Sequence, residues 1–585
     1  MKKHLLIVVG LLSGVLLAGP AEWRNGERVP LWPEGKIPHF QEHQIGEMTD
    51  VAGGYPLKPK EGFDAAAHRM PYIEWFAAPT NANGGCMILV SGGSYQNCCD
   101  VGLIKFWRDE LTSRGFQCVN LVYRTPRPRN LPIYQSAWED GQRAVRLVRA
   151  AAKDRGFDPE KIGVIGMSAG GHLTCLLATN SQTPSYEKVD AIDDLPCHVN
   201  WAIANAPAYN TANGASGDQT KQDGLSIVPT INPCFAFDAK TCPMCFHHGG
   251  VDPWTPNGST LMYRELRKRH IPAELHLYAD KPHGAHGFEC ALEFMRQMNF
   301  DGKLGGERLH EHRFYPGDTI RTEKEMLWPS GKMPHGDICH PFDPYLVWFV
   351  PEKPTTKAIQ VIVPGGGYSM CNFNGEGTPV AHYLNGKGMT TVVVMYRVPH
   401  PPTLAKHEVA WQDAQRAIRL VRSEAPARGL DPDRIGIMGF SAGGHLTLMT
   451  ATNAQTPAYE PVDEIDKLPC KVQWACPIYP AYALTDGLSR PNETGGNDDS
   501  AVLAPEFAFD GDTPPMCFVH GDADAWAAMN SVKCWEKLRS MGIQSDLHTL
   551  AKRGHCFQMK AAPDTGSYNW LDRVWDFLCR KGLNK

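Results

Sequence analysis

The chain carries one eight-residue motif twice, and this repeat constrains the fold more than any other feature. Residues 166–173 read GMSAGGHL and residues 439–446 read GFSAGGHL, so equivalent positions lie 273 residues apart (439 − 166). The same offset relates pairs spread over more than a hundred residues: Tyr95 and Tyr368, Arg124 and Arg397, Asp140 and Asp413, and Trp201 and Trp474. A register held over this length indicates a tandem duplication. We therefore expect two similar domains.

Length and composition agree with two globular domains. The 585 residues give each copy enough chain to bury its own core. Hydrophobic residues make up 42% and charged residues 21%, as in soluble globular proteins. The net charge is −5, and lysine and arginine are scattered rather than clustered, which disfavours a nucleic-acid or anionic-membrane partner.

The N-terminus has the pattern of an export signal. A basic start, Met1–His4, precedes an apolar run from Leu5 to Ala18, and Gly19 and Ala21 offer small residues for cleavage. We expect a signal peptide over residues 1–21, a secreted or periplasmic protein, and no stable membrane insertion after cleavage. The alternative is a membrane anchor, for which the apolar run is short.

Each copy alternates β-branched runs with amphipathic segments of helical length. This pattern predicts an α/β fold, with a mostly parallel sheet flanked by helices in each copy. We place domain 1 at residues 22–305 and domain 2 at residues 306–585. The expected strands of domain 1 lie near residues 86–90, 117–123, 162–165, 200–203, 244–247 and 274–277.

Two further patterns concern surfaces. The expected helix over residues 136–155 carries Arg143, Arg146 and Arg149 on one face, which we interpret as solvated or ion-paired. Residues 208–243 and 481–514 form long polar segments, and loops of this length are usually functional. We expect them over the rim of the active site.

The chain has 18 cysteines, and export would permit disulfides. Cys242 and Cys245 have the spacing of a redox or zinc motif. The second copy has Pro514 where this spacing would require a cysteine, so the two copies do not share such chemistry. We expect no metal and no cofactor.

The repeated motif contains Gly-x-Ser-x-Gly, which presents a serine on a sharp turn between a strand and a helix. The strand-like runs 162–165 and 435–438 precede it, and helix-like runs follow it. The glycines admit a backbone geometry that a Cβ would obstruct, and the helix start favours developing negative charge. Ser168 and Ser441 are therefore the predicted nucleophiles.

A serine nucleophile needs a base and an acid that orients the base. Asp252 follows the apolar run 244–246, at the end of an expected strand. Its counterpart at an offset of 272 (524 − 252) is Asp524, which this register favours over Asp522. We predict Asp252 and Asp524 as the acids, although an aspartate after a strand can also serve only as a turn former.

The bases are sought in the loops after the last strands. We predict His286, within Gly-Ala-His-Gly-Phe, and His555, within Gly-His-Cys-Phe. His283 is a second candidate in the first copy and is interpreted as a bystander. A loop histidine is often only a surface residue, but the order Ser, Asp, His occurs in both copies and favours a triad.

A tetrahedral oxyanion is stabilised by backbone N–H donors beside the serine. A glycine-rich loop follows the first core strand in each copy, as SGGSY at 91–95 and PGGGY at 364–368. The expected donors are Gly93, Ser94 and Ala169 in domain 1, and Gly366, Gly367 and Ala442 in domain 2. Ser94 is compatible with this role unless its position requires a positive φ.

These motifs together carry a family resemblance. Leu327-Trp328-Pro329, the PGGGY loop, Tyr396-Arg397, GFSAGGHL and the segment around His555 resemble α/β-hydrolase esterases of the acetyl xylan esterase and bacterial feruloyl esterase-like (BD-FAE) type. The resemblance covers nearly all of both copies and is closer in the second. It departs from the family at Ser91, Ser94 and Cys556.

The resemblance implies two tandem α/β-hydrolase domains that hydrolyse carboxyl esters without a cofactor, with acylated carbohydrate or another small ester as substrate. Acetyl is the acyl group we expect. One alternative is a peptidase of the prolyl-oligopeptidase type, but no propeller-like repeat precedes either copy. Another is that domain 1 is a non-catalytic glycan-binding module, which its altered glycine loop favours and its predicted triad opposes.

Overall fold

The computed structural model describes residues 25–44, 70–78, 82–99, 101–212, 230–298, 300, 321–337, 343–485, 502–557 and 570–584. The chain divides into two compact units, the first formed by Met1–Leu275 with Asp280–Glu307, the second by His276–Ala279 with Arg308–Lys585. The predicted signal peptide, residues 213–229 and 486–501 of the long polar segments, and residues 301–320 lie outside the described residues. Within the described part, no helix is long and apolar enough to cross a membrane.

The first sheet has the strand order β1-β2-β4-β3-β5-β6-β7-β8. β2 is antiparallel to β1 and β4, whereas β4, β3, β5, β6 and β7 are parallel to one another. The strands are β1 Glu27–Pro30, β2 Tyr72–Phe76, β3 Cys86–Val90, β4 Gln117–Val122, β5 Ile162–Met167, β6 Trp201–Asn205, β7 Met244–Gly249 and β8 Ala273–Tyr278. Each strand predicted for the first copy coincides with one of β3 to β8.

The second sheet repeats this order as β9-β10-β12-β11-β13-β14-β15-β16. Its second strand is again antiparallel to both neighbours, and the strands that follow are parallel. The strands are β9 Arg321–Met326, β10 Tyr345–Val350, β11 Ile359–Val363, β12 Thr390–Met395, β13 Ile435–Phe440, β14 Trp474–Ile478, β15 Cys517–Gly521 and β16 Asp546–Leu550. The predicted α/β fold is thus confirmed in both copies.

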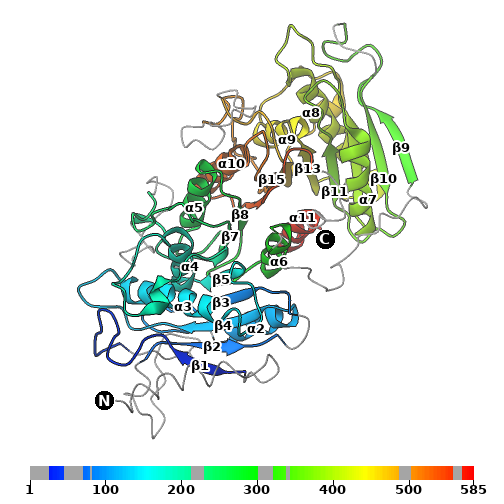
Figure 1. Cartoon of the computed structure of the whole chain (residues 1–585). Helices are drawn as coiled ribbons and strands as arrows, with labels where there is room; N and C mark the ends of the chain where they lie inside the picture. The colour runs from blue at the N-terminus through cyan, green and yellow to red at the C-terminus, as the bar shows by residue number, and fades with distance from the viewer. Residues whose placement is uncertain are drawn as a thin grey trace, which may run out of the picture. The chain divides into compact units, whose positions relative to one another are not determined.

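Helices cover both faces of each sheet (Figure 1). In the first unit these are α2 Val101–Ser113, α3 Gln135–Ala151, α4 Ala169–Thr179, α5 Asn257–Lys268 and α6 Phe288–Gln297, with the short η2 Ala191–Asp194. In the second they are α7 Thr378–Gly386, α8 Glu408–Glu424, α9 Ala442–Thr452, α10 Met529–Ser540 and α11 Trp570–Arg580, with the short η5 Phe373–Gly377, η6 Pro426–Arg428 and η7 Glu464–Lys467. α4 packs on β5 and β6, and α9 packs on β13 and β14. The middle of each sheet is therefore buried on both faces.

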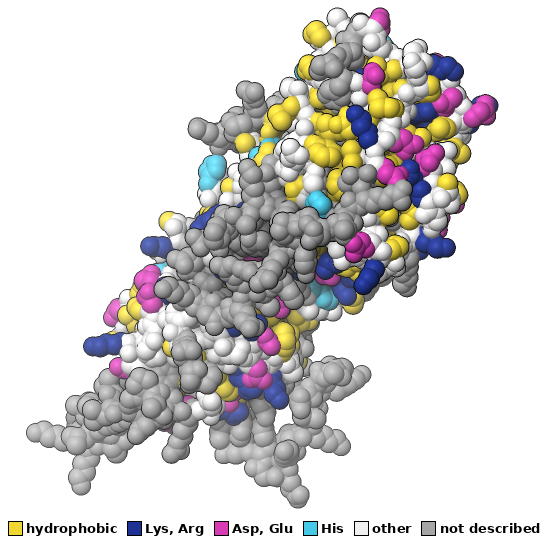
Figure 2. All heavy atoms as spheres, turned by 90° about the vertical axis from the view of Figure 1, so that its right-hand side faces the viewer, with side chains coloured by type: hydrophobic (Ala, Val, Ile, Leu, Met, Phe, Trp, Pro, Cys, Tyr) yellow, Lys and Arg dark blue, Asp and Glu magenta, His cyan; other side chains and the backbone are white. Residues whose placement is uncertain are grey.

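On the face shown in Figure 2, basic and acidic side chains are interspersed over the described surface. The described surface also carries exposed ion pairs, such as Lys467 Nζ with Glu464 Oε1 at 2.5 Å. Exposed pairs of this kind contribute little to stability, because water screens both charges. The mixed surface corresponds to the scattered charges of the sequence.

Arg143 and Arg149 of α3 are buried and Arg146 is half-buried, so the prediction of a solvated face is wrong and that of ion pairing holds in part. Arg143 bridges Asp190 and Asp193 at 2.6 and 2.9 Å, and its side chain is 3% exposed. Arg149 donates to backbone carbonyl oxygens, including that of His198 at 2.8 Å. The segment that precedes β6 covers these guanidinium groups and supplies their partners.

A buried ion pair joins the start of each copy to its interior. In the second unit Trp328 Nε1 donates to Asp413 Oδ1 at 2.7 Å, and Arg397 donates to the same carboxylate from its backbone N–H at 2.8 Å and from Nε at 3.0 Å. Trp32, Arg124 and Asp140 repeat this arrangement in the first unit. The repeated Leu-Trp-Pro and Tyr-Arg motifs are thus parts of one structural contact.

Breaking this contact should destabilise the second unit strongly. We expect Asp413→Asn to cost roughly 3–5 kcal/mol, because it leaves the buried Arg397 guanidinium without a countercharge. Chemical denaturation of the full chain, compared with the parent, measures this cost. Lys467→Ala is the control, since it removes only an exposed pair and should change stability by less than about 1 kcal/mol. Equal stabilities for the two variants would contradict the prediction.

Candidate active site

Both predicted serines lie on a strained turn between a strand and a helix. Ser168 has φ 57° and ψ −120°, and Ser441 has φ 54° and ψ −118°, between β5 and α4 and between β13 and α9. A Cβ on Gly439 would lie 2.2 Å from the Gly443 carbonyl oxygen, and one on Gly443 would lie 2.2 Å from that of Val363. The glycines of the motif are therefore required by space, because the helix start lies against the neighbouring strand.

In the second unit the structure brings together all three predicted triad residues. Ser441 Oγ lies 2.7 Å from His555 Nε2, within hydrogen-bonding distance. His555 Nδ1 lies 2.8 Å from Asp524 Oδ2 and 3.0 Å from Oδ1. This is the geometry in which an imidazole takes the proton of a serine hydroxyl while a carboxylate fixes its orientation.

The electrostatics favour a charged imidazolium beside an ionised carboxylate. Burial lowers the pKa of His555, but the hydrogen bond and charge of Asp524, together with the adjacent Cys556 side chain, raise it overall to about 9. Burial raises the pKa of Asp524, but His520 and His555 lower it overall below its usual range. The site therefore stabilises the ion pair that forms when the base accepts a proton.

A second histidine holds the acid in each unit. His520 Nε2 lies 3.3 Å from Asp524 Oδ2, and its Nδ1 lies 2.8 Å from Ser531 Oγ. His248 makes the same contacts with Asp252, at 3.1 Å, and with a serine. Sequence reasoning missed this role, although a histidine four residues before the acid in both copies was the available signal.

In the first unit the structure corrects the predicted base. His283 Nδ1 lies 2.7 Å from Asp252 Oδ2, whereas His286 Nε2 lies 2.8 Å from the Pro282 carbonyl oxygen. The repeat register already separates the two histidines, since His555 and His283 are 272 residues apart (555 − 283), as are the two acids. His286 lies 269 residues before His555 (555 − 286) and so falls outside this register.

The first unit also differs at the serine. Within the described part of the chain, Ser168 forms no hydrogen bond with His283, unlike the equivalent pair in the second unit. The Asp252 carboxylate is nevertheless ionised, because His248 and His283 outweigh the effect of burial and lower its pKa well below the usual range. In the first unit the predicted acid therefore has a histidine partner, and the contact from that histidine to Ser168 is open.

The two glycine-rich loops share one backbone geometry. Gly93 and Gly366 have φ 120° and 134°, and the next residues, Ser94 and Gly367, have φ 53° and 64°. This position requires a positive φ, so the serine of the first copy is strained where the glycine of the second is not. The third expected donors, Ala169 and Ala442, begin α4 and α9, where backbone N–H groups have no partner within the helix.

A buried histidine anchors each loop to the helix that follows the serine. Tyr368 Oη lies 2.7 Å from His445 Nδ1, and Tyr95 Oη lies 2.7 Å from His172 Nδ1. Burial lowers the pKa of His172 to about 3, so it is neutral in this bond. The histidine of the GGHL motif thus positions the loop. The sequence shows only that this histidine is repeated.

Behind the site of the second unit lies a buried carboxyl group that has no counterpart at the equivalent position of the first copy. Glu376 Oε2 accepts a hydrogen bond from the Gly365 N–H at 2.7 Å, and Tyr479 Oη donates to Glu376 Oε1 at 2.9 Å. The Tyr479 ring packs edge-on against His555, with centroids 5.1 Å apart. The first copy has Leu103 and Ala206 at these positions. This connection between loop and base is a difference between the copies that motif comparison did not single out.

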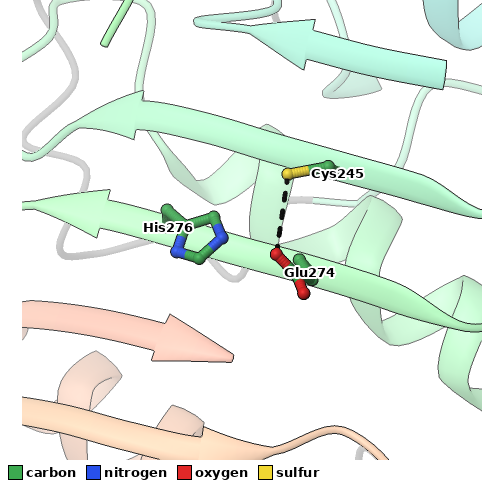
Figure 3. Close-up of side chains that lie close together, drawn as sticks. All are labelled: Cys245, Glu274 and His276. Atoms are coloured by element: carbon green, nitrogen blue, oxygen red, sulfur yellow. Dashed lines mark hydrogen bonds between the residues drawn. The ribbon is translucent and has the colours of Figure 1, made fainter. Parts of the chain in front are cut away.

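Among the described residues, three groups of side chains have the donor atoms for a metal ion. One comprises Cys245, Glu274 and His276, with Cys245 Sγ 4.0 Å from Glu274 Oε2 (Figure 3), and its repeat is Cys517, Asp546 and His548. In the repeat, the Asp546 carboxylate already binds the Arg580 guanidinium, and burial raises the pKa of the Cys517 thiol. The third is His407, His445 and Glu506, in which His445 also binds Tyr368. The contacts that these side chains make with one another and with their neighbours account for their positions.

The chain matches the BD-FAE family model over residues 76–266 and again over residues 347–538. It belongs to the BD-FAE family. The acetylxylan esterase of Xylanibacter ruminicola is 29% identical over 221 residues, which cover 36% of this chain and 43% of that protein. Endo-1,4-beta-xylanase B of Butyrivibrio fibrisolvens is 28% identical over 264 residues, 42% of this chain and 38% of that protein. The matched segments thus span less than half of these curated relatives.

Among solved structures, the acetyl ester-xyloside bifunctional hydrolase from Caldicellulosiruptor lactoaceticus aligns with 46% of this chain and 99% of its own, at 26% identity and a TM-score of 0.38. The family assignment rests on the two matched domains. One BD-FAE domain falls in each unit, so the chain carries the family's α/β-hydrolase domain twice.

Exchanging the loop residue between copies should reveal the strain. Gly367→Ser places a side chain at φ 64°, and we expect it to cost about 1–2 kcal/mol of stability. Ser94→Gly removes such a cost and should leave stability equal or up to about 1 kcal/mol higher, since glycine also loses more chain entropy on folding. Denaturation midpoints measure both variants. A Gly367→Ser chain as stable as its parent would contradict this account.

Removing the Cys556 thiol should shift the pH dependence of the second site. His555 must be neutral to accept the Ser441 proton, so turnover rises as pH passes upward through the pKa of His555. Cys556 raises that pKa, and Cys556→Ala should therefore move the rising limb to lower pH. The pH–rate profile, taken in a Ser168→Ala background, checks this. A limb that stays in place or moves to higher pH would contradict it.

Proposed function

We propose that this chain is a serine carboxyl-ester hydrolase that removes acyl groups, acetyl above all, from carbohydrate. The observation that carries the proposal is the hydrogen-bonded set Ser441, His555 and Asp524, with separations of 2.7 and 2.8 Å. Membership of the BD-FAE family supports an ester as the substrate. The similarity to an acetylxylan esterase and to a xylanase supports an acylated polysaccharide as its source.

In this mechanism Ser441 Oγ attacks the ester carbonyl carbon while His555 Nε2 takes its proton. The N–H groups of Gly366, Gly367 and Ala442 stabilise the tetrahedral oxyanion, an effect worth roughly a hundred- to thousand-fold in rate per donor. His555 then gives the proton to the leaving sugar oxygen, which departs as a hydroxyl group. An acyl-enzyme remains on Ser441. Water, deprotonated by His555, releases the carboxylic acid by the same route in reverse.

For the first unit we propose Ser168, His283 and Asp252 as the triad, with His283 in place of His286. The N–H groups of Gly93, Ser94 and Ala169 are the matching donors. The open contact between Ser168 and His283 and the strained Ser94 suggest a slower site. A unit that binds glycan without catalysis is the alternative that these two features favour.

Secretion belongs to the same proposal. An export signal at residues 1–21 agrees with a polymeric substrate outside the cytoplasm.

Separate removal of the two nucleophiles tests the proposal. Ser441→Ala should abolish most of the acetate released from acetylated xylan and from a chromogenic acetyl ester, since loss of a nucleophile costs about 10⁴-fold or more. Ser168→Ala should remove a smaller share, and the double variant nearly all.

Full activity in Ser441→Ala would refute the assignment of the main site. If Ser168→Ala changes nothing on any ester tested, the first unit is the binding module. Cleavage of a prolyl peptide instead of both esters would favour the peptidase.

A further inference from the structure

Two aromatic side chains stand beside the triad of the second unit. The rings of Tyr482 and Trp526 meet edge to face, with centroids 4.6 Å apart at 67°. Trp526 lies 6.1 Å from the ring of His555, and Tyr482 lies 6.0 Å from Tyr368, the residue after the oxyanion glycines. Both are only partly buried, so each ring keeps some area open to a ligand.

The backbone fixes these rings relative to the catalytic groups. Tyr482 has φ 59°, a left-handed conformation that costs a non-glycine residue roughly 1–2 kcal/mol. The Trp526 N–H donates to Asp524 Oδ1 at 2.8 Å, so the acid of the triad also places the tryptophan. Backbone strain of this kind persists where the surroundings enforce it, and it is concentrated at functional sites.

The first unit contains the same pair. Tyr209 and Trp254 lie 4.9 Å apart at 63°, Tyr209 has φ 60°, and the Trp254 N–H donates to Asp252 Oδ1 at 2.8 Å. Trp254 lies 6.4 Å from His283. The pair is thus present in the copy that has leucine and alanine at the positions of Glu376 and Tyr479. In the first unit, however, Tyr209 is only 1% exposed, so the pair leaves an open ring only at Trp254.

A cationic side chain lies over the tyrosine in each unit, although the two cations occupy unrelated positions in the repeat. Lys406 Nζ is 4.3 Å from the Tyr482 ring centroid. The Arg127 guanidinium is 5.6 Å from that of Tyr209 and donates to its hydroxyl at 2.7 Å. In each unit the cation covers one face of the tyrosine ring, so the open ring area of the pair lies on the partly buried tryptophan.

We propose that Trp526, placed by Tyr482 and Asp524, forms a saccharide subsite that holds the sugar carrying the ester in the second unit. A pyranose has an apolar C–H face and a rim of hydroxyl groups, which suit the partly exposed indole ring and the nearby Lys406 ammonium group. The leaving sugar oxygen takes its proton from the triad histidine, and the tryptophan lies next to that histidine. This inference rests on the proposed function and names the part of the substrate that Trp526 recognises.

The test compares a saccharide ester with a small one in a Ser168→Ala background. Trp526→Ala should lower kcat/KM for an acetylated xylo-oligosaccharide about tenfold or more, mainly through KM, and change that for a chromogenic acetyl ester much less. Trp526→Phe retains an aromatic face and should recover part of the loss. Met541→Ala, at an exposed apolar residue after α10, is the control and should alter neither substrate.

The outcomes separate this inference from the proposed function. Equal losses on both esters, or no loss on either, would overturn the saccharide subsite while leaving the esterase in place. If the parent hydrolyses neither ester, the proposed function fails, and binding then decides the subsite. For that purpose an unacetylated xylo-oligosaccharide is titrated onto the Ser168→Ala, Ser441→Ala chain by calorimetry. Binding that Trp526→Ala abolishes would uphold the subsite, and no binding, or binding that survives this change, would overturn it.

Discussion

The left-handed turn at Ser168 and Ser441 is the constraint on which the arrangement of each site depends. It directs the serine side chain away from the sheet while the helix after it starts against the neighbouring strand, which leaves no room for a Cβ on the flanking glycines. The same turn brings the GGHL histidine against the tyrosine of the oxyanion loop. Nucleophile, loop and helix are therefore fixed together, and the late strands add only the acid and the base.

The two copies keep this frame and differ around it. Both retain the left-handed serine, the histidine behind the acid, and the aromatic pair beside the base. They differ in the residue after the oxyanion glycine, in the serine–histidine contact, and in the carboxyl group behind the loop. These differences lie at and beside the predicted catalytic groups, and they agree with the proposal of two sites of unequal activity.

Much of this could be predicted from the sequence because the signals are local or repeated. Strand and helix order follow from hydrophobic runs, and Ser441, Asp524 and His555 follow from motifs at strand ends. The prediction of His286 over His283 is wrong, because His283 contacts Asp252 while His286 contacts the Pro282 carbonyl oxygen. Only the repeat register reports which loop position reaches the acid. Contacts such as His520 with Asp524, or Glu376 with Tyr479, join residues whose chemistry is ambiguous until the fold brings them together.

The Glu376–Tyr479 bond limits how the copies could have diverged. Replacing Tyr479 by alanine alone would leave a buried carboxyl group with one partner fewer, and replacing Glu376 by leucine alone would strand a buried hydroxyl and the Gly365 N–H. Each intermediate carries the penalty of an unsatisfied polar group, whereas both end states avoid it. The substitutions that separate the copies here are therefore epistatic. A mutational path between them is easiest where a rearranged side chain or a trapped water compensates the intermediate.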